Sequence, residues 1–185
     1  MRGAGVAKSD RRLIGEYLAG SDDAFGALFD RHNQALYGFA RHLSGSDSDG
    51  EDLCQSAWLE AIRSINSFRG RGSFRAWLHG IALNLHRDGL RRPRLDLVAL
   101  DPEQRDPHGD PQRAAEGAEV RAALLHLEAE HREVLILHEL QGFKYREIAQ
   151  IVGCPIGTVK SRLHYAVAAL RNVLGAERSA QGGRP

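Results

Sequence analysis

The segment 153–171, GCPIGTVKSRLHYAVAALR, joins a turn to side chains that could contact a polyanion. Val159, Leu163, Val167 and Leu170 recur at spacings of four, four and three, which predicts one apolar face of an α-helix. The other flank of this helix carries hydrogen-bonding groups at Lys160, Ser161, Arg162, His164 and Tyr165. Groups of this kind contact phosphates and base edges in a DNA groove.

The residues before the turn extend this pattern to a helix-turn-helix. Segment 143–153 is predicted to be a short amphipathic helix, with the small Ala149 where two helices would cross and Gly153 at the tight turn. An ordinary helical hairpin would also fit an isolated corner. The donors crowded over 157–162 favour DNA binding, because a recognition helix makes its base contacts in its first turns.

A second candidate site is FRGRGSFRAWL, residues 68–78. Its aromatic residues, Phe68, Phe74 and Trp77, alternate with Arg69, Arg71 and Arg75, a mixture that stacks unpaired bases while holding their backbone. The alternative is that the aromatic residues, Trp77 above all, belong to the core. A phosphate-binding loop of a nucleotide-handling enzyme is weakly supported, since GxxxxGK[ST] is absent.

The sequence contains few of the motifs that mark metal sites or enzyme active sites. The nine histidines form no HxxxH or HExxH, and Cys54 and Cys154 lie far apart, so we expect no metal site and two small apolar cysteines. No GxSxG or Cys-His signature is evident. We therefore expect no enzyme, no catalytic residue, no cofactor and no small-molecule substrate.

The sequence predicts an all-α fold. Apolar periodicity indicates helices over 27–43, 51–65, 74–92 and 143–153, and two helices within 119–141 separated by a break at 128–131. Polar residues over 44–50 are expected to cap the second helix. No apolar run approaches a membrane span and the start lacks a signal-peptide core, so we expect a cytoplasmic protein without membrane insertion.

Charge divides the chain into two small domains. Residues 51–94 carry eight arginines against four acidic residues, and residues 144–178 carry six basic against two acidic residues. Between them, 95–119 contains three of the six prolines and has an acidic excess, as in a flexible linker. We predict a domain over 1–94, a linker over 95–119, a domain over 120–176 and a disordered tail over 177–185.

Two long segments in this order resemble the bacterial RNA polymerase sigma factors of the extracytoplasmic-function (ECF, group 4) branch of the sigma-70 family. They are EDLCQSAWLEAIRSINSFRGRGSFRAWLHGIALNLHRDGLRR and HREVLILHELQGFKYREIAQIVGCPIGTVKSRLHYAVAALR. The resemblance implies a region 2 domain and a region 4 domain with the linker passing through the polymerase channel. It implies core RNA polymerase (its clamp helices and β-subunit flap), promoter DNA and an anti-sigma factor as partners, the last able to hold the protein at the membrane.

The resemblance also assigns site residues. It places core-polymerase binding at Glu51, Asp52, Leu53, Gln55 and Trp58. It places the −10 element at Phe68, Arg69, Arg71, Ser73, Phe74, Arg75, Trp77, Asn84, Arg87, Asp88, Arg91 and Arg92. It places the −35 element at Thr158, Lys160, Ser161, Arg162, His164 and Tyr165, with Arg162 on a phosphate.

Departures from the family pattern concern three places. Tyr165, Ala166 and Val167 stand where arginines are usual, so promoter preference is expected to differ there. Cys54 and Ser56 replace an aliphatic residue and an acid in the docking helix, and Gly89 loosens the end of the −10 helix. An alternative interpretation remains open: a stand-alone helix-turn-helix regulator with an N-terminal sensing or dimerisation domain.

Energetics favour a polymerase-dependent factor. Opening ten base pairs costs about 14 kcal/mol at about 1.4 kcal/mol per stacking step. Three aromatic residues that stack bases at about 1–3 kcal/mol each would recover about half of that. The chain by itself is therefore not expected to melt DNA.

Overall fold

The structure is a computed structural model that describes residues 8–70, 72–91 and 119–181, with the side chains of 175–181 left aside. Every regular element in these ranges is helical, as the sequence predicts. The predicted linker, 95–119, lies outside the described residues except for its last position.

Over residues 8–70 and 72–91, the N-terminal domain contains four helices and one short turn. They are α1 (Asp10–Leu18), α2 (Asp22–Ser44), α3 (Asp47–Ser64), the 3₁₀ turn η1 (Ile65–Ser67) and α4 (Phe74–Arg91). The sequence patterns did not predict α1, and α2 begins five residues earlier than predicted. α3 begins within the predicted polar break, because the Ser46 side chain accepts a hydrogen bond from the Asp49 amide and caps it.

The C-terminal domain begins with a helical segment over 119–125, followed by α6 (Ala129–Leu135) and the π-helical turn η2 (Ile136–Leu140). Two helices separated by a break are thus confirmed, but the break lies at 126–128 and not at 128–131, since residues 129–131 already belong to α6. Next come α7 (Tyr145–Val152) and α8 (Ile156–Gln181). Gly153 has a φ of 74° and ends α7, so the turn needs a glycine as predicted.

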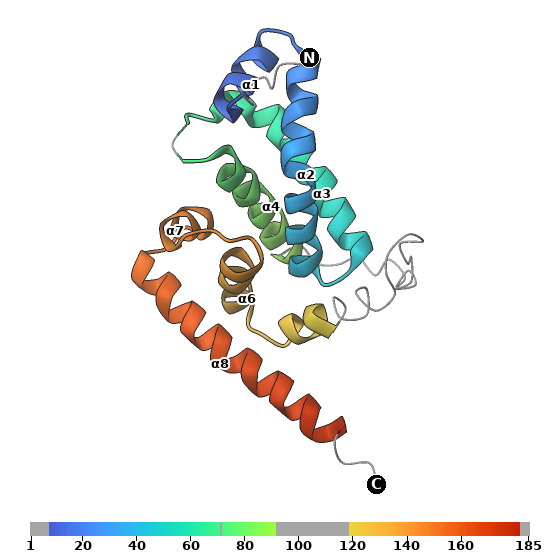
Figure 1. Cartoon of the computed structure of the whole chain (residues 1–185), viewed down its shortest axis with the longest axis vertical. Coiled ribbons are helices and arrows are strands. Elements are labelled where there is room, and N and C mark those ends of the chain that lie inside the picture. Colours follow the sequence, from blue (N-terminus) through green and yellow to red (C-terminus); the bar gives the residue numbers. More distant parts are fainter. Residues whose placement is uncertain (1–7, 71, 92–118, 182–185) are drawn as a thin grey trace, which may run out of the picture.

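Helix α8 is longer than expected. It continues to Gln181, which is five residues into the segment 177–185 predicted to be a disordered tail. Its last described residues, GAERSAQ, include alanine, glutamate, arginine and glutamine, which are good helix formers. Figure 1 shows this end of α8 running beyond the other helices.

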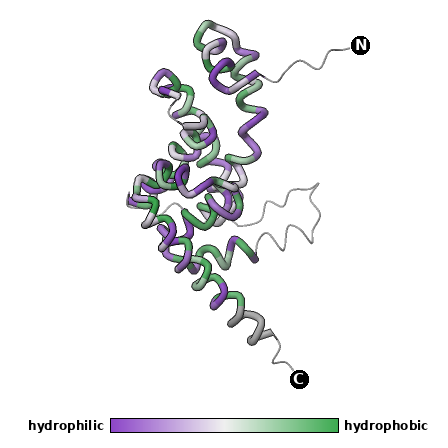
Figure 2. Tube along the Cα trace, turned by 60° about the vertical axis from the view of Figure 1, so that its left-hand side comes forward, coloured by the Kyte–Doolittle hydropathy of each residue, from purple (hydrophilic) through white to green (hydrophobic). Residues whose placement is uncertain are grey.

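The two domains pack against each other. In Figure 1, α6 lies below α4 and α7 lies to the left of its lower part, while α2 and α3 run side by side. α4 contacts α7, and α2 contacts η2. Buried apolar side chains of both domains form one continuous cluster, and apolar and polar residues alternate along the helices that cover it (Figure 2).

Candidate nucleic-acid and polymerase interfaces

The first turns of α8 present an exposed polar surface. Lys160, Ser161, His164 and Tyr165 are exposed, whereas Val159 and Leu163 are buried on the opposite side. Tyr165 is 60% exposed and its ring lies 6.0 Å from that of His131 in α6. The structure therefore leaves four of the six predicted −35 residues accessible on one side of the helix.

The other two −35 candidates are less accessible. Thr158 is half-buried, and its carbonyl accepts a hydrogen bond from the Ser161 hydroxyl at 3.0 Å. Arg162 is held in an ion pair with Glu130 of α6. A phosphate contact by Arg162 would have to compete with this carboxylate.

One expectation about promoter preference needs correction. Ala166 is fully buried and Val167 is half-buried against the core, so these two residues belong to the packing face of α8. Of the three residues Tyr165, Ala166 and Val167, only Tyr165 is exposed. The helical period explains this, since 163, 166, 167 and 170 share one face.

Helix α4 has three faces with different surroundings. One face packs in the N-terminal core, a second faces the C-terminal domain, and a third is exposed. Asn84, Asp88 and Arg91 are exposed at spacings of four and three, with half-buried Trp77 on the same side. These four of the predicted −10 residues therefore form one accessible stripe.

Two −10 candidates face the C-terminal domain instead. Arg75 donates a hydrogen bond to the carbonyl of Gln141, and its guanidinium lies 4.3 Å from the centre of the Phe143 ring. Arg87 pairs with the buried carboxylate of Glu133. In this arrangement both cations are engaged within the chain rather than open to DNA.

Some side chains of the loop before α4 pack in the core and others are exposed. Phe74 is 2% exposed, so it packs in the core and cannot stack a base without leaving it. Phe68 and Trp77 are half-buried with ring centres 5.5 Å apart, and Arg69 and Ser73 are exposed. The Ser73 hydroxyl also caps α4 by accepting from the Ala76 amide at 3.2 Å. Arg71 and Arg92 lie outside the described residues.

Because Phe74 is buried, only Phe68 and Trp77 of the three proposed aromatic residues remain to stack bases. This lowers the stacking free energy that could offset strand opening. Two aromatic residues at about 1–3 kcal/mol each recover even less of the cost of strand opening than three. If this loop stacks unpaired bases, it therefore needs a partner that holds the strands apart even more than three stacking residues would.

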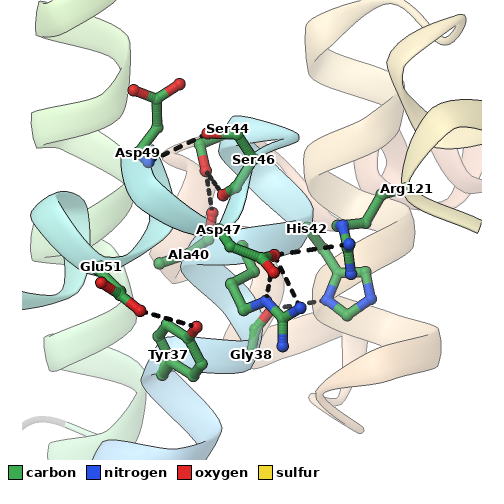
Figure 3. Close-up of polar contacts among 11 residues, drawn as sticks. Tyr37, Gly38, Ala40, His42, Ser44, Ser46, Asp47, Asp49, Glu51 and Arg121 are labelled. Atoms are coloured by element: carbon green, nitrogen blue, oxygen red, sulfur yellow. Dashed lines mark hydrogen bonds and ion pairs between the residues drawn. The ribbon is translucent and has the colours of Figure 1, made fainter. Parts of the chain in front are cut away.

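A groove of about 390 Å³ runs between α2 and α3. Its floor is aromatic: the Trp58 ring lies 5.7 Å from Phe25 and 5.0 Å from Phe29, and its indole nitrogen donates to Asn33 at 3.0 Å. Glu51 lies at its rim, where it accepts from the Tyr37 hydroxyl at 3.4 Å (Figure 3). We call this the aromatic groove.

Only some of the predicted polymerase-binding residues line the aromatic groove. Glu51, Gln55 and Trp58 line it, although Trp58 is only 5% exposed and forms the floor. Asp52 is exposed outside the lining. Leu53 is half-buried and lines a different hollow beside α4. Positions 51, 55 and 58 share one helical face, and 52 and 53 do not.

Sequence reasoning missed most of the groove. Phe25, Phe29, Asn33 and Tyr37 of α2 and Leu59 and Ile62 of α3 complete its lining. A signal was present: the four α2 residues recur every four positions, as one row along a helix. Leu59 lines the groove and is 47% exposed, so its side chain is open to a partner.

Metal-binding and membrane-spanning features are absent from the described part of the chain. No group of three or more histidine, cysteine or acidic side chains there is placed to hold a metal ion. None of the helices in those ranges combines the length and apolar character needed to cross a bilayer.

These surfaces belong to a two-domain helical protein that has a helix-turn-helix in its C-terminal domain and an aromatic groove in its N-terminal domain. Family models match both halves: Sigma-70 region 2 over residues 28–95 and Sigma-70 region 4 over residues 117–170. The ECF RNA polymerase sigma factor SigM of Mycobacterium tuberculosis is 36% identical over 91% of this chain and 86% of its own length. The ECF sigma-E factor of Haemophilus influenzae is 32% identical over 89% and 94%.

Solved structures agree. CnrH, in complex with the cytosolic domain of CnrY, has a TM-score of 0.73 and 30% identity and covers 91% of this chain and 99% of its own. The sigma factor RpoE of Bartonella quintana, in complex with the anti-sigma factor NepR, has a TM-score of 0.66 and 30% identity, covering 82% and 96%. The chain belongs to the ECF sigma factors of the sigma-70 family. It is therefore a transcription initiation factor, and the stand-alone regulator is set aside because region 2 occupies the place of a sensing domain.

Proposed function

We propose that three surfaces of this sigma factor carry its function. The aromatic groove with Asp52 docks core RNA polymerase, the α4 stripe with the 68–73 loop captures the −10 strand, and the first turns of α8 read the −35 element. The observation that carries the proposal is the exposed row Lys160, Ser161, His164 and Tyr165 at the start of the second helix of a helix-turn-helix. Such a row suits a major groove.

Transcription reconstituted from core polymerase and a cognate promoter tests the −35 assignment. Lys160→Ala with Ser161→Ala is expected to reduce promoter-specific transcripts strongly, because one phosphate or base contact is lost at each position. Arg146→Ala, an exposed cation of α7 outside the assigned set, serves as the matched control. Unchanged transcription by the double variant would refute the assigned readout.

The aromatic groove suits an amphipathic helix as its occupant. Its walls are apolar, its one rim carboxylate is Glu51, and Leu59 and Phe29 remain partly exposed. A helix with an apolar stripe bordered by basic residues would fill the groove and pair with the rim. In this proposal the occupant is the polymerase clamp, while the C-terminal domain contacts the β-subunit flap.

Pull-down with core polymerase tests the groove. Leu59→Glu is expected to weaken binding at least tenfold, since a charge would have to enter an apolar contact. Leu18→Glu is the matched control, because Leu18 is 51% exposed on α1 and lies outside the groove. Equal retention of both variants would rule out the groove as the docking surface.

An anti-sigma factor is the proposed regulator. The similar CnrH and RpoE structures hold CnrY and NepR respectively. By this likeness, an equivalent partner keeps the chain inactive in the cytoplasm, at the membrane if that partner is membrane-bound. The proposed role requires no catalytic residue. Purification of the tagged chain from its own cells is expected to recover core polymerase or a small partner of this class.

A further inference from the structure

The contact between the two domains is built partly from residues assigned to promoter DNA. We call it the domain seam and define it by Arg75, His79 and Arg87 of α4 with Glu133, Gln141 and Phe143 of the C-terminal domain. A second contact, outside α4, joins Asp47 to Arg121. Each of these contacts connects residues more than forty positions apart in the sequence.

Arg87 makes a two-bond ion pair across the seam with a buried carboxylate. Its Nε lies 2.9 Å from Oε1 of Glu133 and its Nη2 lies 2.5 Å from Oε2. Glu133 is 3% exposed, and the pair holds the Arg87 pKa above its usual value. A two-bond fork onto a carboxylate is also the geometry with which arginine binds a phosphate. While its fork is paired with Glu133, Arg87 has no fork to offer a phosphate.

Arg75 and His79 meet the same short segment of the C-terminal domain. Arg75 donates to the Gln141 carbonyl and lies over the Phe143 ring. His79 is fully buried, with its Nε2 3.3 Å from Oε1 of Gln141 and its ring centre 5.0 Å from that of Phe143. A base approaching Arg75 would collide with this segment.

A further contact closes the seam at α3. Figure 3 shows Arg121 reaching Asp47, which also pairs with Arg41. The Arg121 guanidinium lies 3.5 Å from the Asp47 carboxylate and its side chain is 15% exposed. Neither residue belongs to the assigned DNA surfaces, so this contact contributes to closure alone.

Among the described residues, two buried polar atoms without a partner lie next to the seam, on the residues that precede Arg87 and Glu133 in the sequence. Nε2 of His86 and Nε of Arg132 are buried and have no hydrogen-bond partner in the described part of the chain. Burial without a partner disfavours the closed arrangement. Water would satisfy both atoms once the domains part.

We propose that the C-terminal domain and promoter DNA compete for the same face of α4, so that this closed chain masks part of its own −10 surface. The inference rests on the proposed function for the identity of the DNA. Closure itself does not depend on it. Promoter binding must then break the Arg87–Glu133 pair and release Arg75.

This competition is tested with two substitutions that change the net charge in opposite directions. Glu133→Gln removes an anion and Arg121→Gln removes a cation, while both leave every assigned DNA-binding side chain intact. Small-angle X-ray scattering of the full chain should show a compact native protein and a larger radius of gyration for each variant. Glu16→Gln, which removes exposed ion pairs of α1 away from the seam, should stay compact.

The same proteins are then titrated against fluorescein-labelled oligodeoxythymidine, followed by anisotropy. Because apparent affinity scales with the open fraction, we expect a gain of about tenfold for Glu133→Gln and about threefold for Arg121→Gln. Glu16→Gln should not differ from the native chain. Measuring both seam variants protects the test against misfolding of either one.

Other results would overturn the inference. If scattering shows that the native chain is already extended, the closed state does not exist in solution. If the variants expand but bind the oligonucleotide no more tightly, the C-terminal domain does not compete with DNA. Tighter binding by Glu133→Gln with weaker binding by Arg121→Gln indicates a plain charge effect. None of these bears on promoter-specific transcription, so failure of the proposed function would be seen separately in the reconstituted assay.

Discussion

At the scale of single residues, Asn33 joins the two walls of the aromatic groove through hydrogen bonds from α2 to α3. Its side-chain oxygen accepts from the Trp58 indole nitrogen at 3.0 Å and from the Cys54 thiol at 3.5 Å. Trp58 is almost fully buried, so its N–H needs this partner. Asn33 thereby fixes the orientation of the ring that forms the groove floor.

We expect Asn33→Ala to lower the free energy of unfolding by about 1–3 kcal/mol, because it leaves a buried N–H without a partner. Urea denaturation followed by circular dichroism measures the change. Asn66→Ala, at an exposed position of η1, is the control and should change little. An unaltered midpoint for Asn33→Ala would show that the hydrogen bond contributes nothing.

The two cysteines differ in chemical reactivity. Burial raises the pKa of the Cys54 thiol to about 11, whereas Cys154 is only half-buried. Since the thiolate is the reactive form, we expect iodoacetamide at pH 8 to modify Cys154 well before Cys54. Mass spectrometry of peptides over a time course measures both rates. Equal rates would contradict the buried placement of Cys54.

At the scale of elements, the close crossing of α2 and α3 depends on Gly50. A Cβ atom at this position would lie 2.8 Å from the Arg41 Cα, a backbone atom that cannot rotate away. The lack of a side chain allows the two helices to approach, and this approach shapes the groove above them. At Gly26, on the exposed side of α2, a Cβ atom would have no neighbouring atom within 4 Å.

We therefore expect Gly50→Ala and Gly26→Ala to act in opposite directions. Gly50→Ala should destabilise the protein by about 1–3 kcal/mol through overpacking. Gly26→Ala should stabilise it by about 0.5–1 kcal/mol, because alanine loses less backbone entropy in a helix. Thermal and urea unfolding compare the two. A neutral Gly50→Ala would mean that the helices separate without cost.

At the scale of the whole molecule, the seam introduces a dependence on pH. His79 is fully buried at the seam, and burial lowers its pKa to about 4. Two positive or potentially positive neighbours, Arg75 and His32, lower it further. Burial also lowers the pKa values of His42 and His86. All three shifts favour the neutral imidazole in the folded chain.

The sign follows from proton binding. Between pH 6.5 and pH 4 the unfolded chain binds a proton at His79 that the folded chain does not, so stability is present at pH 7 and is lost as the pH falls. For His79 alone we expect a loss of about 2 kcal/mol between pH 7 and pH 5. Unfolding free energies measured across this range test the slope. His79→Gln, which cannot titrate, should flatten it, and an equally steep slope would contradict the assignment.

Much of the fold and part of the site were predictable from local patterns. The presence of a break within 119–141, although not its position, the turn at Gly153 and the exposed row on α8 follow from helical periodicity and turn chemistry, which depend on nearby residues. The roles of Phe74 and Ala166 were not predictable in this way. Whether an aromatic or small residue faces core or solvent depends on which helix packs over it.

The sequence by itself determined that this protein is helical, with two basic segments and a helix-turn-helix in its second half, because periodicity, glycine positions and charge act over short stretches of chain. Only the tertiary structure decided that Arg75 and Arg87 face the C-terminal domain and that an α2 row completes the aromatic groove. Those contacts join residues distant in sequence. Their partners are set by how whole helices pack, which no local pattern specifies.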